Sequence, residues 1–280
     1  MRSECQDITF VVTRSTGGNL QKLCQGQKET SSLTIFEKNF AASPCLGEIR
    51  PDRIIVQEGF SSAATAFNDA IDRAETDLIV FAHQDVYFPG DWLTNLNQSL
   101  DILERSDPDW GVLGGWGVNN RGLQVGYLYS AGLGVLGKPF AQPIAIDTLD
   151  EYVLIMRKSS GLRFDPKLPH FHFYGTDICL SARKKKKSCY AISAFCIHNT
   201  SYGLLPPEFF ECYWHVKRKW KEFLPIQTSC IRVTRWNEEL IVRRLKHVYL
   251  TLFRRDYKLF PRLEDPRSVL QIVAAPFEKE

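Results

Sequence analysis

His83, Gln84 and Asp85 follow directly on an apolar run at residues 78–82. Such a short run is typical of a strand covered on both faces of a parallel sheet, and ligands of open α/β sheets bind beyond the carboxyl ends of the strands. Asp85 is not followed at once by a helix, which disfavours a capping role, and carboxylates bind hard cations together with diphosphates. We therefore predict a metal ligand at Asp85. His83, on the same side of the chain if it stays extended, either binds the metal or packs beside it.

Asp177 is a second candidate, because it follows the segment 171–176 and opens a helix expected over residues 177–187. Two interpretations are open for its carboxylate. It either interacts with the helix dipole from the first turn or acts as a general base on a substrate hydroxyl. The two roles conflict, since a helix N-terminus lowers the pKa of a carboxylate and so weakens a base.

Two further segments carry polar groups near expected strands. His198 ends a strand expected over residues 189–197, where a histidine is either a structural residue or a metal contact. The acidic segment 147–151 precedes another strand, expected over residues 152–156. It is either a solvated turn or a set of acceptors for sugar hydroxyls.

The elements that must position these groups alternate along residues 1–115. Apolar runs predict strands over residues 8–13, 53–57, 78–82 and 112–113. Apolar residues at helical spacing predict helices over residues 63–74 and 92–103. This alternation is typical of an open parallel α/β sheet. The Gly-rich residues 111–145 that follow are expected to form strands and loops that line a site.

The last part of the chain is expected to be mostly helical, which suggests a domain over residues 1–205 and a helical extension over residues 206–280. The clearest late helix is marked by Ile241, Leu245, Val248 and Leu252. Seven basic residues accompany it: Arg243, Arg244, Lys246, Arg254, Arg255, Lys258 and Arg262. They indicate either a helix on a membrane surface or, as the favoured interpretation, the basic outer face of a packed helix.

Composition narrows the class of protein. The 280 residues are 44% hydrophobic and 24% charged, as in a globular protein, and a net charge of +3 does not indicate a nucleic-acid binder. The N-terminus lacks the features of a secretory signal and no apolar run approaches the length of a membrane span, so we expect a cytoplasmic protein with its eight cysteines as free, buried thiols. Motifs of P-loop enzymes, α/β-hydrolases and HExxH metalloproteases are absent.

Taken in order, four segments resemble the family 2-like glycosyltransferases. They lie at residues 61–68, 81–86, 171–180 and 197–198, within a similarity that covers residues 50–200 and weakly the first strand. The subgroup that looks most similar is the one described through a streptomycin-biosynthesis protein, which carries an HQDV segment.

The resemblance implies a GT-A fold, which is a mixed α/β sheet flanked by helices, here with a helical C-terminal extension. It also implies an inverting, hexosyltransferase-like enzyme that uses a nucleotide-diphosphate sugar with Mg²⁺ or Mn²⁺. The family's Asp-x-Asp metal motif stands here as His83-Gln84-Asp85, so its first Asp is replaced. Asp177 matches the catalytic base, and His198 matches a position that can contact the metal.

The resemblance also places residues around the two substrates. Thr13, Gly59 and Asn68 match positions near the donor nucleotide, alongside Gln84 and Asp85. The resemblance places Asp150 and His172 beside the acceptor. The acceptor would be a glycan, a lipid-linked sugar or a small molecule. Because the first Asp of the metal motif is missing, the alternative is a non-catalytic module of the same fold that binds a nucleotide-sugar or a partner.

Overall fold

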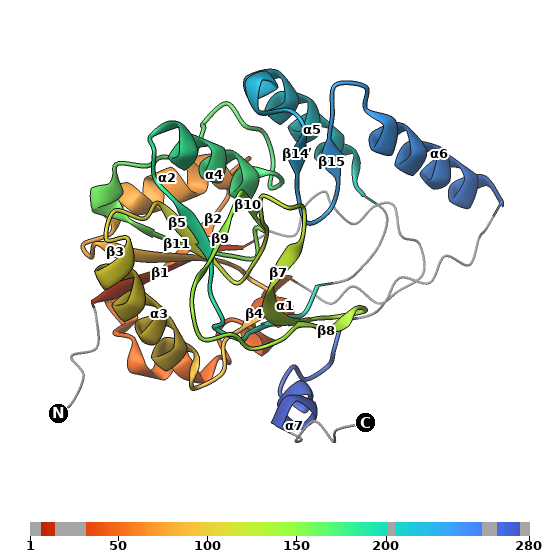
Figure 1. Cartoon of the computed structure of the whole chain (residues 1–280). Helices are drawn as coiled ribbons and strands as arrows, with labels where there is room; N and C mark the ends of the chain where they lie inside the picture. Colours follow the sequence, from red (N-terminus) through yellow and green to blue (C-terminus); the bar gives the residue numbers. More distant parts are fainter. Residues whose placement is uncertain (1–6, 15–31, 201–204, 254–261, 275–280) are drawn as a thin grey trace, which may run out of the picture.

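The computed structural model describes residues 7–14, 32–200, 205–253 and 262–274 (Figure 1). A central seven-stranded sheet runs in the order β2-β1-β3-β11-β5-β12-β9. The strands are β1 (Ile8–Arg14), β2 (Ile54–Glu58), β3 (Leu78–His83), β5 (Val112–Gly114), β9 (Ile144–Ile146), β11 (Val153–Arg157) and β12 (Cys189–Ala191). The side chains of β1 and β3 are buried almost throughout, as expected for strands covered on both faces.

The central sheet is mixed in direction. β1 pairs in parallel with β2 and β3, and β12 pairs in parallel with β5. Between β3 and β5 the sheet accepts β11, which runs antiparallel to both, and β9 is antiparallel at the edge. The four strands expected in residues 1–115 are therefore present, but a strand from later in the chain separates the last two. The expectation of a mixed α/β sheet flanked by helices is confirmed.

Helices cover both faces of this sheet (Figure 1). They are α1 (Ser32–Lys38), α2 (Ala63–Arg73), α3 (Trp92–Ser106) and α4 (Tyr174–Lys184), with short 3-10 helices at Pro44–Glu48, Pro51–Arg53, Lys158–Ser160 and Lys221–Phe223. The apolar stripes of α2 and α4 form one core cluster with one face of the sheet, and that of α3 forms a second cluster with the other face. Burial of these two faces holds the layers together.

A second sheet lies beside the carboxyl end of β3, in the order β10-β6-β7-β13-β4, with β8 paired to β7. Its strands are β4 (Val86–Tyr87), β6 (Trp116–Val118), β7 (Gln124–Ser130), β8 (Gly134–Gly137), β10 (Thr148–Leu149) and β13 (Ile197–His198). The prediction of a single strand over residues 189–197 is wrong. The chain leaves the central sheet after β12 and joins the second sheet as β13.

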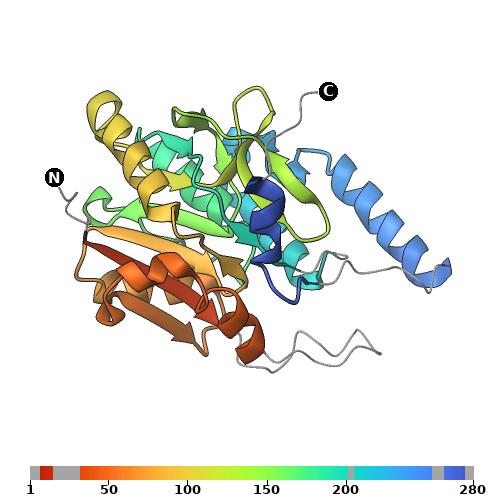
Figure 2. The same ribbon diagram turned by 90° about the horizontal axis from the view of Figure 1, so that it is seen from below.

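The C-terminal part contains α5 (Pro207–Lys219), a hairpin of β14 (Ile226–Gln227) and β15 (Arg232–Val233), α6 (Glu238–Phe253) and α7 (Ser268–Ala274). Side chains of α5 and the hairpin belong to the same core cluster as α2 and α4, so packing continues across residue 206. Seen from below, α6 extends away from the rest (Figure 2). Within the described ranges no helix combines the length and apolarity needed to cross a membrane.

Six cysteines fall in the described ranges, all of them free. Cys230 is exposed and the other five are buried, so the expectation of buried thiols fails at that one position. Cys230 lies close to the hairpin of β14 and β15, whereas the buried thiols sit in or beside the packed layers.

Candidate metal centre

Three side chains with metal-binding atoms meet where β3, β4 and β13 end. His83 is the last residue of β3, and Gln84 and Asp85 turn the chain into β4. β4 pairs antiparallel with β13, which places His198 opposite Val86 and next to Asp85. One ligand atom from each of His83, Asp85 and His198 lies within 4.8 Å of the others. The backbone N–H of the residue after His198 also donates to the Asp85 carbonyl at 2.8 Å.

A turn, not an extended chain, brings His83 and Asp85 together. Asp85 Oδ1 lies 3.9 Å from His83 Nδ1 and 3.5 Å from His198 Nε2. These distances are too long for good hydrogen bonds. They leave room for a cation that would contact all three groups.

Buried polar atoms without partners mark the same place. Among the described residues, Asp85 Oδ1, His198 Nε2 and Gln84 Oε1 are buried and accept or donate no hydrogen bond. Buried polar atoms are nearly always paired in proteins, so such a group needs an explanation, and an ion is a standard one. Two imidazole nitrogens and a carboxylate oxygen suit a divalent transition metal, so the residues fit the metal that the resemblance implies.

The protonation states of His83 and Asp85 suit metal binding, whereas the raised pKa of His198 means that its ring must release a proton to bind a cation. Burial lowers the pKa of His83 to about 4, so its ring is neutral at neutral pH. Burial acts to raise the pKa of Asp85, but the neighbouring His198, with smaller effects of the His83 ring and Arg262, outweighs it and holds that pKa below its usual range. Burial likewise acts to lower the pKa of His198, but the Asp85 carboxylate outweighs it and raises that pKa. A neutral His83 and an ionised Asp85 are the forms that bind a cation.

Tyr174 fixes the orientation of the His83 ring. Its hydroxyl donates to the Glu151 carbonyl at 2.8 Å and lies 2.6 Å from His83 Nε2. Because the phenol has one hydrogen and gives it to the carbonyl, it must accept from Nε2. The lone pair of His83 is then on Nδ1, the atom that faces Asp85.

Arg262 is a site residue that the sequence pattern did not single out. It belonged to the basic set expected on an outer helix face, yet its Nη2 lies 3.6 Å from Asp85 Oδ2. The side chain of Asn199 holds it there, because it donates to the Leu263 carbonyl at 3.0 Å and accepts from the Leu263 N–H at 2.7 Å. Arg262 therefore brings a fixed positive charge next to the metal centre.

The acidic pair Asp150 and Glu151 lies near these groups. Asp150 Oδ1 accepts from the Glu151 N–H at 2.8 Å, and Oδ2 accepts from Ser229 at 2.6 Å. Burial, with the charge of Asp150 added, raises the pKa of Glu151 well above its usual value. Gly175 allows α4 to approach this pair, because a Cβ there would meet the Leu149 carbonyl at 2.7 Å.

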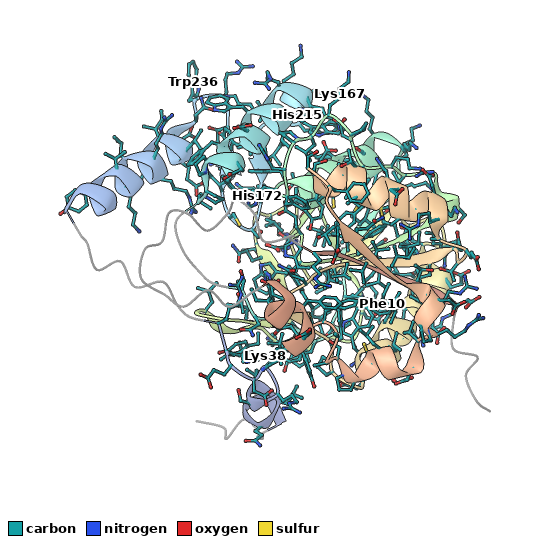
Figure 3. The ribbon with its side chains drawn as sticks, turned by 180° about the vertical axis from the view of Figure 1, so that it is seen from behind. Phe10, Lys38, Lys167, His172, His215 and Trp236 are labelled. Atoms are coloured by element: carbon teal, nitrogen blue, oxygen red, sulfur yellow. The ribbon has the colours of Figure 1, made fainter. Side chains whose placement is uncertain are left out.

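His172 approaches the centre from the loop before α4. Burial first, and then the charge of His83, lowers the pKa of His172 to about 4. Its ring packs on Phe209 of α5, on the side of α5 that faces α1 (Figure 3). Asp150 also acts electrostatically on His83, so both predicted acceptor residues lie within range of the metal centre.

Asp177 lies in the first turn of α4 and is only 1% exposed. Its two oxygens accept from Lys219 Nζ at 2.7 and 2.9 Å, and Oδ1 also accepts from Trp220 Nε1 at 2.7 Å. Burial raises the pKa of Asp177, although Lys219 and Trp220 oppose this. The helix N-terminus that raised doubt about a base is therefore not the dominant influence.

The three positions matched to the donor nucleotide have different surroundings. Thr13 pairs with His83 across β1 and β3, at the carboxyl end of both strands. Gly59 follows β2 with a φ of 78° and open space where a side chain would be. The amide of Asn68 is engaged, since it binds the Phe164 carbonyl and N–H at 2.8 and 3.0 Å. Thr13 and Gly59 thus remain free to face a ligand.

A groove of about 1120 Å³ lies elsewhere, between α3 and the segment that follows β8. Aromatic side chains of Tyr127, Phe140 and Phe195 line it, together with Asn95 and other polar residues. None of its lining residues belongs to the metal centre, so the site is assigned from its donor atoms and not from the size of a cavity.

Known proteins offer limited guidance. No family model matches the chain. A protein of Fuscovulum blasticum described as "ATP synthase subunits region ORF 6" is 26% identical over 160 residues, which cover 55% of this chain and 63% of that protein. The chain therefore matches less than two thirds of that relative's length.

Two solved structures are similar at low identity. S. aureus TarS (residues 1–349) has a TM-score of 0.46 and 11% identity, over 90% of this chain and 74% of that one. GalNAc-T7, solved with UDP, GalNAc and Mn²⁺, has a TM-score of 0.49 and 8% identity, over 78% and 50% of the two chains. These likenesses are too weak to carry an argument about activity, which depends on the site itself.

Proposed function

We propose that the chain is a metal-dependent glycosyltransferase that moves a sugar from a nucleotide-diphosphate donor to an acceptor hydroxyl. One observation carries the proposal: His83, Asp85 and His198 converge at the carboxyl end of β3, and Asp85 and His198 each have a buried atom without a hydrogen-bond partner. The order of the segments that resemble family 2-like glycosyltransferases supports it independently. The donor set favours Mn²⁺ over Mg²⁺, because imidazole nitrogens are poor ligands for magnesium.

The charge around the centre suits a diphosphate leaving group. When bound, the cation would neutralise the negative charge that develops on the diphosphate. Arg262 adds a guanidinium at the same place, and guanidinium groups bind phosphate oxygens with two hydrogen bonds. Thr13 and Gly59, at the ends of β1 and β2, would face the nucleotide.

The acceptor hydroxyl must lose a proton to a base. Asp177 is the proposed base, because burial raises its pKa and because it lies three residues after Tyr174, on the same face of α4 that contacts His83. Lys219 occupies both carboxylate oxygens, so the acceptor must take one of them over. Direct displacement, with the acceptor oxygen attacking the anomeric carbon opposite the departing diphosphate, would invert that carbon.

Glu151 is the competing base. It follows Asp150, which the resemblance places at the acceptor, and burial raises its pKa as it does that of Asp177. Turnover of a panel of nucleotide-sugars should be compared in Asp177→Asn and Glu151→Gln, with Mn²⁺-induced thermal stabilisation as the control for folding and metal binding. Loss of turnover in Asp177→Asn alone supports Asp177, and loss in Glu151→Gln alone transfers the role to Glu151.

The same assay tests the proposal as a whole. Thermal stabilisation by a nucleoside diphosphate that depends on metal, followed by sugar transfer, is the expected result, since a ligand of the folded state stabilises it by mass action. Stabilisation without turnover of any donor by the wild-type chain would instead identify a non-catalytic nucleotide-sugar-binding module. Absence of both metal and nucleotide binding would overturn the proposal.

A further inference from the structure

α6 leaves the body of the molecule after its first turn. Leu240 is buried in the core cluster shared with α5 and the hairpin. Beyond it, every side chain described between residues 241 and 249 is exposed. Figures 1 and 2 show the helix extending away from the sheets in both views. The buried anchor of the helix is therefore at one end, and the apolar side chains of Ile241, Leu245 and Val248 beyond it are exposed.

The exposed face of α6 is apolar. Ile241 is 52% exposed and Leu245 is 65% exposed, and Val242 and Val248 are exposed as well. Residues 241, 245 and 248 follow helical spacing and form one stripe. The favoured expectation from the sequence, a helix that packs this stripe inward and shows a basic face to solvent, is thus wrong.

Such a helix is unfavourable in water without a partner. Isolated helices of this length are marginal, because packing of an apolar face supplies most of the stability of helices in proteins. A contiguous exposed apolar stripe is also typical of surfaces that bind a protein or a membrane. The stripe of α6 therefore indicates an occupant.

The charges of α6 indicate which kind of partner covers the apolar stripe. Past the first turn its described charged residues are all basic, namely Arg243, Arg244 and Lys246. At 100° per residue, Arg244 lies about 40° beyond Val248 on one side of the apolar face, and Lys246 lies about 40° beyond Val242 on the other. A second copy packed on this face would bring like charges together along both edges. An anionic surface would pair with both edges while the stripe enters its apolar layer.

We propose that α6 binds the surface of an anionic lipid membrane, with its apolar stripe in the interface and its basic edges on the head groups. At 16 residues the helix is shorter than the roughly 20 needed to span a bilayer, so it lies on the membrane. Trp236, 78% exposed and just before α6, stands at the outer edge of the molecule (Figure 3). Tryptophan is enriched at membrane–water interfaces. The proposal does not depend on glycosyl transfer, although it suits a lipid-linked acceptor.

Co-sedimentation with phosphatidylcholine vesicles, with and without phosphatidylglycerol, tests this proposal. The full chain should sediment with the anionic vesicles and release as salt is raised. Ile241→Glu/Leu245→Glu should abolish sedimentation. The matched control is Leu123→Glu/Leu133→Glu, which adds the same charge at exposed leucines away from α6 and should bind as the wild type does. Metal-induced thermal stabilisation should be unchanged in both variants, which shows that they fold.

Two further arms make the result decisive. Arg244→Glu/Lys246→Glu should weaken vesicle binding by more than about fivefold for each basic residue lost. Asp85→Asn should bind vesicles as the wild type does, so failure of the proposed function would not be mistaken for failure of docking. Equal sedimentation of the wild type and Ile241→Glu/Leu245→Glu would overturn the proposal. So would a dimer in solution that the same variant dissociates, with no vesicle binding, because a second copy would then be the occupant.

Discussion

Asp85 and Asp177 are both buried carboxylates at ends of regular elements, but their surroundings differ. Asp85 faces His83, His198 and Arg262 at 3.5 Å or more, and its Oδ1 has no hydrogen bond. Asp177 accepts three hydrogen bonds of 2.9 Å or less from Lys219 and Trp220. Positive groups around Asp85 stand at distances that leave space for an ion, whereas those around Asp177 fill the space.

This difference separates a centre prepared for a ligand from a contact that the chain completes itself. A buried charge with incomplete hydrogen bonding is unfavourable in the free protein, and a bound cation would remove that cost. A buried charge that is already paired needs no further ligand, and losing its partner is costly. Substitutions at the two places should therefore affect different quantities.

The largest expected effect is on activity, at Asp85. Asp85→Asn removes the only carboxylate of the metal centre, and a metal that stabilises charge in the transition state contributes several kcal/mol. Turnover should fall by about a thousandfold, and Mn²⁺ should no longer raise the melting temperature, while the fold is kept. Asp52→Asn, at an exposed carboxylate paired with Arg50, is the matched control. If Mn²⁺ raised the melting temperature of Asp85→Asn as much as that of the wild type, Asp85 would not be a metal ligand, and its contrast with Asp177 would fail.

The next effect is on stability, at the partner of Asp177. Lys219→Met leaves the Asp177 carboxylate buried with Trp220 alone, and breaking a buried pair is strongly destabilising. Lys219 is partly exposed and also pairs with Asp165, so we expect a loss of about 2 kcal/mol in the free energy of unfolding. Urea unfolding measures it, with Arg218→Met, at an exposed position of the same helix, as control. A loss no larger than in the control would mean that Lys219 does not hold Asp177.

A smaller effect is expected at Tyr174, which touches the metal centre without binding the metal. Tyr174→Phe removes the hydroxyl between His83 Nε2 and the Glu151 carbonyl. Groups that orient metal-binding histidines typically contribute a factor of ten or more in affinity. Titration with Mn²⁺ should show a Kd raised about tenfold, in a protein that still folds but has a lower melting temperature without metal, because His83 Nε2 and the Glu151 carbonyl lose their partner. An unchanged Kd would show that packing alone orients the His83 ring.

Local sequence pattern predicted part of this candidate site, and long-range packing supplied the rest. Asp85 could be predicted because the apolar run before it is a local signal of a strand covered on both faces. Arg262 could not be predicted, because its place beside Asp85 depends on the hydrogen bonds between Asn199 and Leu263, two residues that are far apart along the chain. In α6 the spacing of apolar residues predicted the helix but not whether its stripe would be covered, because periodicity does not specify a partner.

The smallest effect is a difference in the pH dependence of the two carboxylates that share Lys219. Burial acts to raise the pKa of Asp165, but hydrogen bonds from Lys219, the Lys167 N–H and His215 outweigh it and hold the pKa at about 2. Its contribution to stability is therefore present above the ordinary value of 3.8 and is lost as the pH falls toward 2. The pKa of Asp177 is raised, so its contribution has the opposite sign: it favours folding at low pH and is lost as the pH rises through the folded pKa.

Asp165→Asn should therefore reduce the acid-side loss of stability, whereas Asp177→Asn should steepen it. The change at Asp165 should be under about 1 kcal/mol, because water screens this partly exposed group. Urea unfolding at neutral pH and at a pH between the two values for Asp165 measures both. Parallel pH profiles for the two variants would mean that Asp165 and Asp177 titrate as one unit with Lys219. The contrast between a fully hydrogen-bonded carboxylate and one with an unpartnered oxygen would then depend on Asp85 alone.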